Sequence, residues 1–118
     1  MSGIPTVKKN YEFARIYKRG KFYVAKRMTL YVYPNRTGVT RLGLSVSKKV
    51  GKAVKRNLFR RRMKESIFCY QDGLKAGIDL VFVARKCEEI PGFHEIKKEM
   101  KFLLKKLNAY EENSYSDH

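Results

Sequence analysis

The stretch RLGLSVSKKVGKAVKRNLFRRRMK, residues 41–64, decides the fold, because its hydrophobic period changes in the middle. Across residues 41–48 large apolar side chains alternate with small ones, and this period of two predicts a strand. The large side chains are Leu42, Leu44 and Val46, and the small ones are Gly43, Ser45 and Ser47. From Gly51 to Gln71 the period becomes helical, with one apolar face made by Phe59, Met63, Ile67 and Tyr70. A strand therefore runs directly into a long helix.

Toward the N-terminus the sequence predicts a loose arm, a short helix and a second strand. The arm covers residues 1–7, and the helix covers residues 8–19 with Asn10 as its N-cap. Gly20 is expected to end the helix in the left-handed conformation. Residues 21–33 read as a strand that breaks near Ala25 and Lys26. Residues 34–38 have turn chemistry, so the strands on either side are expected to pair as a hairpin.

Toward the C-terminus the sequence predicts a third strand and a last helix. Residues 78–84 form an apolar run typical of a strand buried on both faces. Residues 93–110 carry an apolar stripe at helical spacing, made by Phe93, Ile96, Met100, Leu103, Leu104 and Leu107. The order α-β-β-α-β-α predicts an α+β fold, an α/β two-layer sandwich. Residues 1–110 are expected to form a single domain, followed by a disordered acidic tail over residues 111–118.

The net charge favours a polyanionic partner. Lys and Arg number 27 against 11 acidic residues, which gives a formal charge of +16. These charges do not lie on one amphipathic segment, so nucleic acid is favoured over a membrane surface. No apolar run approaches the roughly 20 residues of a membrane helix, and the N-terminus lacks a signal-peptide pattern. We therefore expect a cytoplasmic protein. Cys69 and Cys87 lack metal-ligand spacing, and we expect them to be free thiols.

The long helix carries a basic stripe beside its apolar face. Residues 48–64 contain no acidic side chain, and the stripe consists of Arg56, Asn57, Arg60, Arg61 and Lys64. Like charges one turn apart destabilise an isolated helix, and a merely solvated face normally mixes both signs. Because the planar fork of arginine engages two phosphate oxygens at once, the stripe is predicted to meet nucleic acid.

Aromatic residues of the N-terminal half suggest a second contact with nucleic acid. Phe13 and Tyr17 lie one helical turn apart, and Tyr31 points to the sheet face opposite Met28, Leu30 and Val32. The small residues Gly43 and Ser45 would leave a trough beside Tyr31. Such a trough could stack unpaired nucleotides, at about 1–3 kcal/mol per base. Phe13 and Tyr17 could equally be core residues, and the pattern leaves both readings open.

Several of these segments resemble one known family. Residues 41–51, followed by residues 53–57 and the pair Arg60 and Arg61, look like the signature of the bacterial ribonuclease P protein. Residues 8–13 are similar to the N-terminal helix of that family, together with Tyr17, Lys18, Gly20 and Lys21. Residues 78–85 are similar to its last strand. The resemblance runs in the same order from Lys8 to Leu107.

The resemblance implies a fold and a function. The fold would be ribosomal-protein-like, with a left-handed βαβ crossover. The protein would bind a catalytic RNA and the 5′ leader of precursor tRNA, and would assist endonucleolytic removal of the leader. The catalytic centre would lie in the RNA subunit, with magnesium held mainly by the RNA and the substrate. The protein would supply no catalytic or metal-binding residue, and neither a membrane nor an obligate protein partner is implied.

The same resemblance implies two sets of binding residues. The residues expected to bind the catalytic RNA are Lys52, Arg56, Asn57, Arg60, Arg61, Arg62 and Lys64. The residues expected to bind the leader are Lys9, Phe13, Tyr17, Tyr31, Ser45 and Lys48.

The sequence departs from the family pattern at two places. Leu58 stands where a basic residue is usual, and Arg62 stands where an apolar residue is usual, so Arg62 is expected to replace the missing charge. Thr6 and Val7 replace the usual Arg-Leu before the lysine pair.

Other functions were weighed against the resemblance. A structural protein that binds ribosomal RNA is the alternative. A protein-only nuclease is disfavoured, because His94 and His118 lie far apart in the sequence and the carboxylates are scattered. A helix-turn-helix DNA binder lacks the helix that should precede the basic one. Oligomeric state, leader preference and ion positions are left open.

Overall fold

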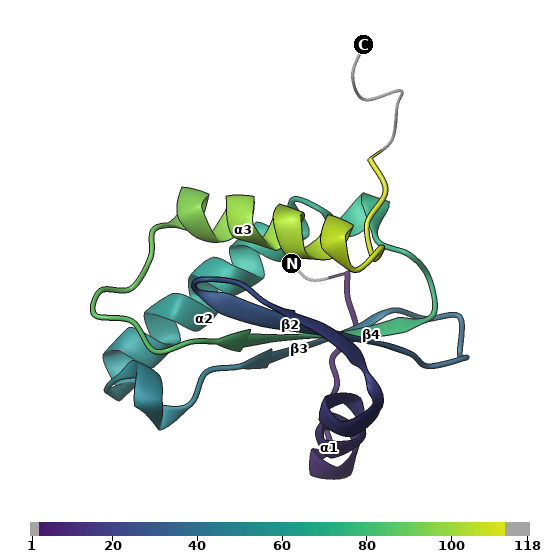
Figure 1. Cartoon of the computed structure of the whole chain (residues 1–118), viewed down its shortest axis with the longest axis horizontal. Helices are drawn as coiled ribbons and strands as arrows, with labels where there is room; N and C mark the ends of the chain where they lie inside the picture. Colours follow the sequence, from purple (N-terminus) through teal and green to yellow (C-terminus); the bar gives the residue numbers. More distant parts are fainter. Residues whose placement is uncertain (1–2, 113–118) are drawn as a thin grey trace.

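The computed structural model describes residues 3–112 and consists of a four-stranded sheet with helices on both faces. The elements are α1 (Asn10–Arg19), β1 (Lys21–Val24), β2 (Met28–Pro34), β3 (Arg41–Ser45), α2 (Ala53–Phe68), β4 (Ile78–Ala84) and α3 (Phe93–Lys106). The predicted α+β fold is confirmed, and the predicted break at Ala25 and Lys26 separates β1 from β2. Helices α2 and α3 cover one face of the sheet, and α1 covers the other (Figure 1). Within the described residues no helix is long and apolar enough to cross a membrane.

The strand order is β1-β2-β4-β3, so the predicted hairpin between β2 and β3 is wrong. Strand β4 lies between them, antiparallel to β2 and parallel to β3. Its Leu80, Val81 and Phe82 are fully buried, and a strand that is apolar on both faces is most stable in the middle of a sheet. The loop after β2 therefore passes the start of β4, where the Asn35 amide donates to the carbonyl oxygen of Gly77 at 2.9 Å.

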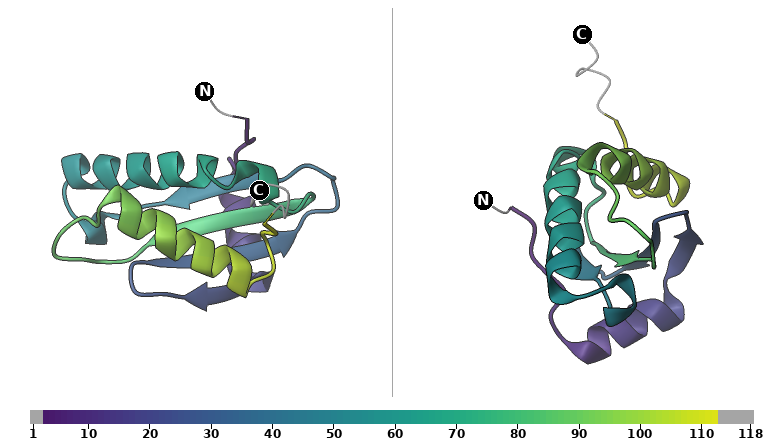
Figure 2. Two further views of the ribbon diagram at one scale, coloured as in Figure 1. Left: turned by 90° about the horizontal axis from the view of Figure 1, so that it is seen from above. Right: turned by 90° about the vertical axis from the view of Figure 1, so that its left-hand side faces the viewer.

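The segment β3-α2-β4 forms the parallel βαβ unit of the fold. Figure 2 shows α2 crossing from β3 to β4 on the face that it shares with α3. The crossover is left-handed, as the resemblance implied, although about 98% of such connections are right-handed.

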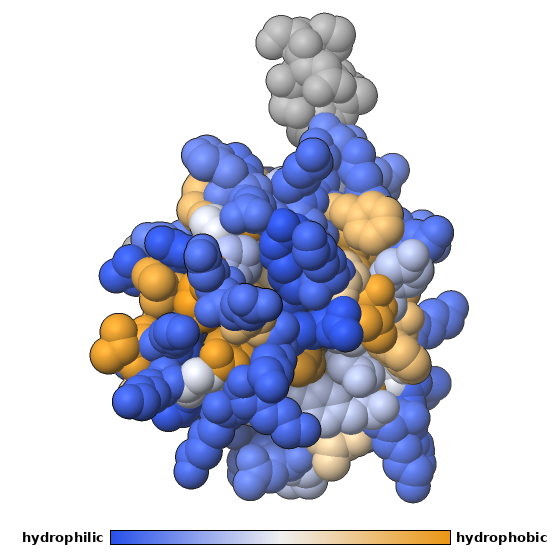
Figure 3. All heavy atoms as spheres, turned by 60° about the vertical axis from the view of Figure 1, so that its left-hand side comes forward, coloured by the Kyte–Doolittle hydropathy of each residue, from blue (hydrophilic) through white to orange (hydrophobic). Residues whose placement is uncertain are grey.

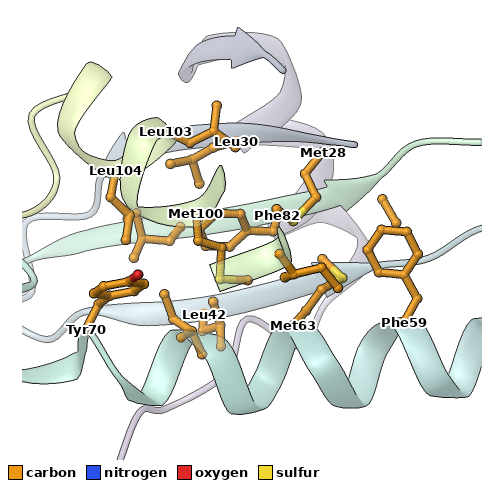
Figure 4. Packing of buried hydrophobic residues seen from close by; sticks show 14 of the residues in the cluster. Met28, Leu30, Leu42, Phe59, Met63, Tyr70, Phe82, Met100, Leu103 and Leu104 are labelled. Carbon is orange, nitrogen blue, oxygen red and sulfur yellow. The ribbon is translucent and has the colours of Figure 1, made fainter. Parts of the chain in front are cut away.

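The main core fills the space between the sheet and helices α2 and α3 (Figure 4). The predicted apolar face of α2 is buried here, at Phe59, Met63 and Ile67. The helix ends at Phe68 and not at Gln71, and Tyr70 is buried just beyond its end. Helix α3 contributes Ile96, Met100, Leu103 and Leu104, all fully buried. Complete burial of such a side chain stabilises the fold by about 1.5–3 kcal/mol, so these two helices hold the sheet from one side.

Helix α1 packs on the opposite sheet face through a smaller cluster of Val7, Ile16 and Val81. Its N-cap is Lys9 and not Asn10, and the Lys9 amide donates to Oε1 of Glu12 at 3.2 Å. Gly20 is extended, with φ −72° and ψ 155°, so the prediction of a left-handed end was wrong. A Cβ at Gly20 would lie 2.6 Å from the carbonyl oxygen of Ile16. Glycine is needed there for space.

The N-terminal arm is more ordered than expected. The Leu42 amide donates to the carbonyl oxygen of Pro5 at 2.8 Å, and the Val7 amide donates to the carbonyl oxygen of Leu42 at 2.9 Å. These bonds cover the outer edge of β3, which would otherwise expose unpaired backbone groups. Met1 and Ser2 lie outside the described residues, as does the predicted disordered tail from position 113. Glu112 forms ion pairs with Lys101 and Lys105.

Gly43 provides the first prediction, because α1 rests directly on it. A Cβ at this position would lie 2.8 Å from Cε1 of Phe13 and 3.2 Å from Cγ2 of Val81. Gly43→Ala should therefore lower the free energy of unfolding by about 1–3 kcal/mol, measured by urea titration. In a Phe13→Leu background the smaller side chain should relieve part of that loss. Strict additivity of the two substitutions would mean that Phe13 is not the group that requires glycine.

Candidate nucleic-acid interface

The basic face of α2 remains free of acidic partners. Lys52, Asn57, Arg61 and Lys64 are exposed, and Arg56 and Arg60 are half-buried. Within residues 3–112, no hydrogen bond or ion pair engages the side chains of Lys52, Arg60, Arg61 and Lys64. Figure 3 views the molecule with the left-hand side of Figure 1, where α2 lies, brought forward. Hydrophilic residues dominate this side. The helix therefore presents uncompensated positive charge, which suits a row of phosphates.

The turn before α2 is held in one conformation. A 3-10 turn spans Lys48–Val50, where Oγ of Ser47 accepts a hydrogen bond from the Lys49 amide at 3.3 Å. Gly51 follows with φ 148°, a conformation that favours glycine, and its carbonyl oxygen accepts from Nε of Arg56 at 3.2 Å. The exposed Lys48 and Lys52 therefore flank the start of α2, where the helix dipole also attracts anions.

Arg62 has a partner inside the protein. Its Nη1 donates to the carbonyl oxygen of Pro91 at 2.8 Å, and the side chain is half-buried. This bond fastens α2 to the segment before α3. Leu58 is also half-buried. The idea that Arg62 replaces the charge missing at Leu58 stays a prediction, and the bond to Pro91 gives Arg62 a structural use that the sequence did not indicate.

Four rings on the α1 side of the sheet form what we call the aromatic cluster: Phe13, Tyr17, Phe22 and Tyr31. The ring centroids of Tyr17 and Tyr31 are 4.9 Å apart, and those of Phe22 and Tyr31 are 5.3 Å apart in a stacked arrangement. Phe13 lies 6.2 Å from Tyr17. Tyr17 is 38% exposed and Phe22 is 56% exposed, so the cluster is open to solvent.

Phe22 was missed by the sequence reasoning. It pairs with Tyr31 in the register of β1 and β2, which places the two side chains on the same sheet face. The alternation before the predicted strand break puts Phe22 and Val24 on one face and Tyr23 on the other, but only the register of β1 against β2 places Phe22 beside Tyr31.

The predicted trough is displaced by one strand. Tyr31 pairs with Val81, and Val81 pairs with Gly43, so β4 separates the tyrosine from the small residues. Phe13 covers Gly43. The adjacent row across the strands carries Thr29, Val83 and Ser45. Val83 and Ser45 are half-buried. This row lies nearer the end of β3 that leads to Lys48, so the sheet face of the aromatic cluster continues toward the start of α2.

Helix α1 is held over the sheet by a charged network. Asp79 is 1% exposed and accepts from Nε and Nη2 of Arg41 at 2.8 and 2.7 Å. Nδ2 of Asn35 donates to the same carboxylate at 2.8 Å. Nη1 of Arg41 donates to Oε2 of Glu12 on α1 at 2.7 Å. The arginine thus joins β3 and β4 to α1 with all groups paired, as buried charges require.

The network shifts the pKa values of Glu12 and Arg41. The hydrogen bond from Arg41 lowers the pKa of Glu12, with help from the Lys9 amide. The carboxylates of Asp79 and Glu12 raise the pKa of Arg41. Sequence reasoning did not find this network, although an acid inside the apolar run IDLVFVA, residues 78–84, was a usable signal.

The remaining predicted leader residue, Lys9, is exposed at the start of α1. The fold thus brings the predicted leader residues Phe13, Tyr17 and Tyr31 together on one sheet face, and places the other predicted set on α2. Among residues 3–112, no group of three His, Cys, Asp or Glu side chains could hold a metal ion.

Comparison with known proteins gives one consistent family. The family model described as Ribonuclease P matches residues 2–108. The ribonuclease P protein component of Clostridium kluyveri is 49% identical over 106 residues, which cover 88% of this chain and 95% of that protein. The RNase P protein of Staphylococcus aureus superposes with a TM-score of 0.82 at 31% identity, over 90% of this chain and 97% of that chain. The RNase P protein of Thermotoga maritima superposes with a TM-score of 0.77 at 27% identity, over 86% of this chain and 96% of that chain.

Glu12 provides a prediction about pH. Its pKa is lowered in the folded protein, so its contribution to stability is present above the unfolded pKa of about 4.3 and is lost as pH falls through the folded value. The unfolding free energy of the wild type should therefore fall more steeply between pH 5 and pH 3 than that of Glu12→Gln, whose amide does not titrate. Glu95 and Glu112, whose pKa values are also lowered, titrate in both proteins. Parallel curves for the two proteins would contradict the contribution assigned to Glu12.

Proposed function

Because the chain belongs to the bacterial ribonuclease P protein family, whose members are the protein subunit of that enzyme, we propose that it binds the catalytic RNA through α2 and the 5′ leader of precursor tRNA through the aromatic cluster. Binding at both places assists endonucleolytic removal of the leader. The family assignment favours this function over the alternative of a structural ribosomal protein.

The observation that carries the proposal is the openness of the aromatic cluster. A cluster that served only the fold would bury its rings, yet Phe22 is 56% exposed and Tyr17 is 38% exposed. Base-aromatic stacking is tolerant of sequence, because every base has a π-face. That property suits a leader that differs from one precursor to another. It also requires an unpaired strand, which the leader provides.

The basic face of α2 suits a different kind of RNA contact. Arg60, Arg61 and Lys64 follow one another along the helix without an acidic neighbour at hydrogen-bond distance in the described part of the chain. Contacts of this kind go to phosphates, which set position and register without reading bases. We assign the predicted RNA-binding residues of α2 to the catalytic RNA on this ground, with Arg62 as the member that already has a protein partner.

The protein itself performs no bond-breaking step in this proposal. Magnesium ions that take part in the reaction would be held mainly by the RNA and the substrate. The contribution of the chain is positive charge and stacking surface, which raise the affinity for a substrate that carries a leader. Its place of action would be the cytoplasm, since the proposed substrate is a tRNA precursor.

Tyr31 tests the leader contact directly. Tyr31→Ala should keep a melting temperature near that of the wild type and normal affinity for the catalytic RNA. Affinity of the reconstituted holoenzyme for precursor tRNA should fall by about 1–3 kcal/mol, because one stacking platform is lost. Affinity for mature tRNA should not change, because mature tRNA has no leader.

Two further variants sharpen this test. Phe22→Ala removes a more exposed ring of the same cluster and should give the same selective loss. Phe102→Ala removes a ring of similar exposure on α3, across the sheet, and should leave both affinities unchanged. Equal losses for precursor and mature tRNA with Tyr31→Ala and Phe22→Ala would remove the cluster from the leader site.

The basic face is tested by salt dependence. Arg60→Ala or Arg61→Ala should weaken binding of the catalytic RNA and reduce the salt slope by about one unit each, because one phosphate contact is lost. Lys98→Ala removes an exposed charge from α3 and is the matched control. Slopes that match the control in both variants would place the RNA elsewhere on the protein.

A further inference from the structure

Helix α1 lies across the strands and divides its side of the sheet in two. Phe13 rests on Gly43 of β3, and Tyr17 contacts Tyr31 of β2, with β4 between those strands. The helix therefore lies across three strands, and Figure 1 shows it on the face opposite α2 and α3. Phe13 and Tyr17 form one flank of α1. The opposite flank of α1 takes no part in the proposed function.

A pocket of about 610 Å³ lies along this second flank, between α1 and the loop that joins β2 to β3. Glu12, Arg15 and Arg19 of α1 form one wall at positions i, i+3 and i+7. Arg36 and Thr37 of the loop form the other wall. We call this the arginine pocket.

The charge of the arginine pocket is not neutralised by the protein. Glu12 is engaged by Arg41, which belongs to the network with Asp79. Arg15, Arg19 and Arg36 are exposed, and within the described residues no carboxylate or carbonyl accepts a hydrogen bond from them. Three free guanidinium groups thus surround one polar pocket, an arrangement whose mutual repulsion a bound polyanion would relieve.

The loop wall is held in place by its own hydrogen bonds. Oδ1 of Asn35 accepts from the Thr37 amide at 2.9 Å, and Nδ2 of Asn35 donates to the carbonyl oxygen of Val39 at 2.7 Å. Arg36 sits between these bonds with φ 61°, a left-handed conformation that is uncommon for a residue with a side chain. The loop is thereby fixed against the start of β4 through Asp79. Arg36 is presented to the pocket from a rigid support.

The chemistry of the pocket identifies its ligand as an RNA backbone. Guanidinium forks bind phosphate oxygens two at a time, so three of them around one pocket suit the phosphates of one strand. Between the two flanks, the outer surface of α1 carries the small Ala14 and the basic Lys18, both exposed. A helix is only about 10–12 Å wide, so a strand that leaves the aromatic cluster can cross it within a few nucleotides.

We propose that the leader, upstream of the nucleotides stacked on the aromatic cluster, crosses α1 and binds the arginine pocket through its phosphates. The inference rests on the proposed function, since it begins from a leader held at that cluster. The leader is the source favoured by position, because the catalytic RNA is assigned to α2 on the other side of the sheet. A short leader would then contact only the aromatic cluster, and a longer leader would contact the arginine pocket as well.

The test measures holoenzyme affinity for precursor tRNAs whose leaders grow one nucleotide at a time. Affinity of the wild type should rise in two steps, first when the leader reaches the aromatic cluster and again when it reaches the arginine pocket. The triple variant Arg15→Gln, Arg19→Gln, Arg36→Gln should keep the first step and lose the second. Tyr31→Ala should reduce the first step.

Salt dependence gives an independent readout. Three single-strand phosphate contacts contribute roughly two units of salt slope, so the deficit of the arginine variant should be roughly 16-fold larger at about 50 mM salt than at about 200 mM. The matched control is Lys26→Gln, Lys86→Gln, Lys98→Gln, which removes the same charge from exposed lysines away from the arginine pocket. It should keep both steps and the slope.

The outcomes separate the inference from the function on which it rests. A first step without a second, or a second step that survives in the arginine variant, overturns the inference and leaves the leader site intact. A loss that is equal for short and long leaders, or that appears in binding of the catalytic RNA alone, assigns the pocket to another RNA segment and also overturns it. Absence of the first step in the wild type overturns the proposed function itself.

Discussion

The pairing of Arg41 with the buried carboxylate of Asp79 is the interaction on which the nucleic-acid surface depends. It fixes the start of β3 against β4, and the remaining guanidinium nitrogen reaches Glu12 to place α1. A carboxylate that is 1% exposed would be costly without such partners, and a well-paired one adds positional specificity. Both flanks of α1 take their position from this contact. In a chain of charge +16, the network pairs one arginine with two of the 11 acidic residues.

Periodicity in the sequence was sufficient for the helices and for the character of each strand. The apolar faces of α2 and α3 are buried as predicted, because the buried face of a helix has an apolar residue at every third or fourth position. Strand pairing was not predicted, because adjacency in sequence favoured a hairpin while burial on both faces favoured β4 in the middle. The predicted conformation of Gly20 was wrong for a related reason. A glycine that is required by a neighbouring carbonyl looks the same in sequence as one required by backbone conformation.

The binding surface was predictable in composition and only partly in geometry. The basic residues of α2 and the rings Phe13, Tyr17 and Tyr31 could be chosen from pattern and resemblance. Phe22 could not be placed without the register of β1 against β2. Arg62 was assigned by its charge and its position one turn after Leu58, and its bond to the carbonyl of Pro91 depends on where a distant loop passes. Contacts between remote segments are decided by the fold, and a single sequence does not record them locally.

The central position of β4 also constrains how the chain can reach its native state. Strands β2 and β3 share no ladder with each other, and each is paired through residues 78–84. During synthesis the first seventy-odd residues emerge without the strand that would join them, so the sheet cannot close early. The basic α2 is then exposed on an unfinished domain whose long-range contacts are slow to form. The order of strands in this sheet thus makes a late segment of the chain, residues 78–84, the one that completes the sheet.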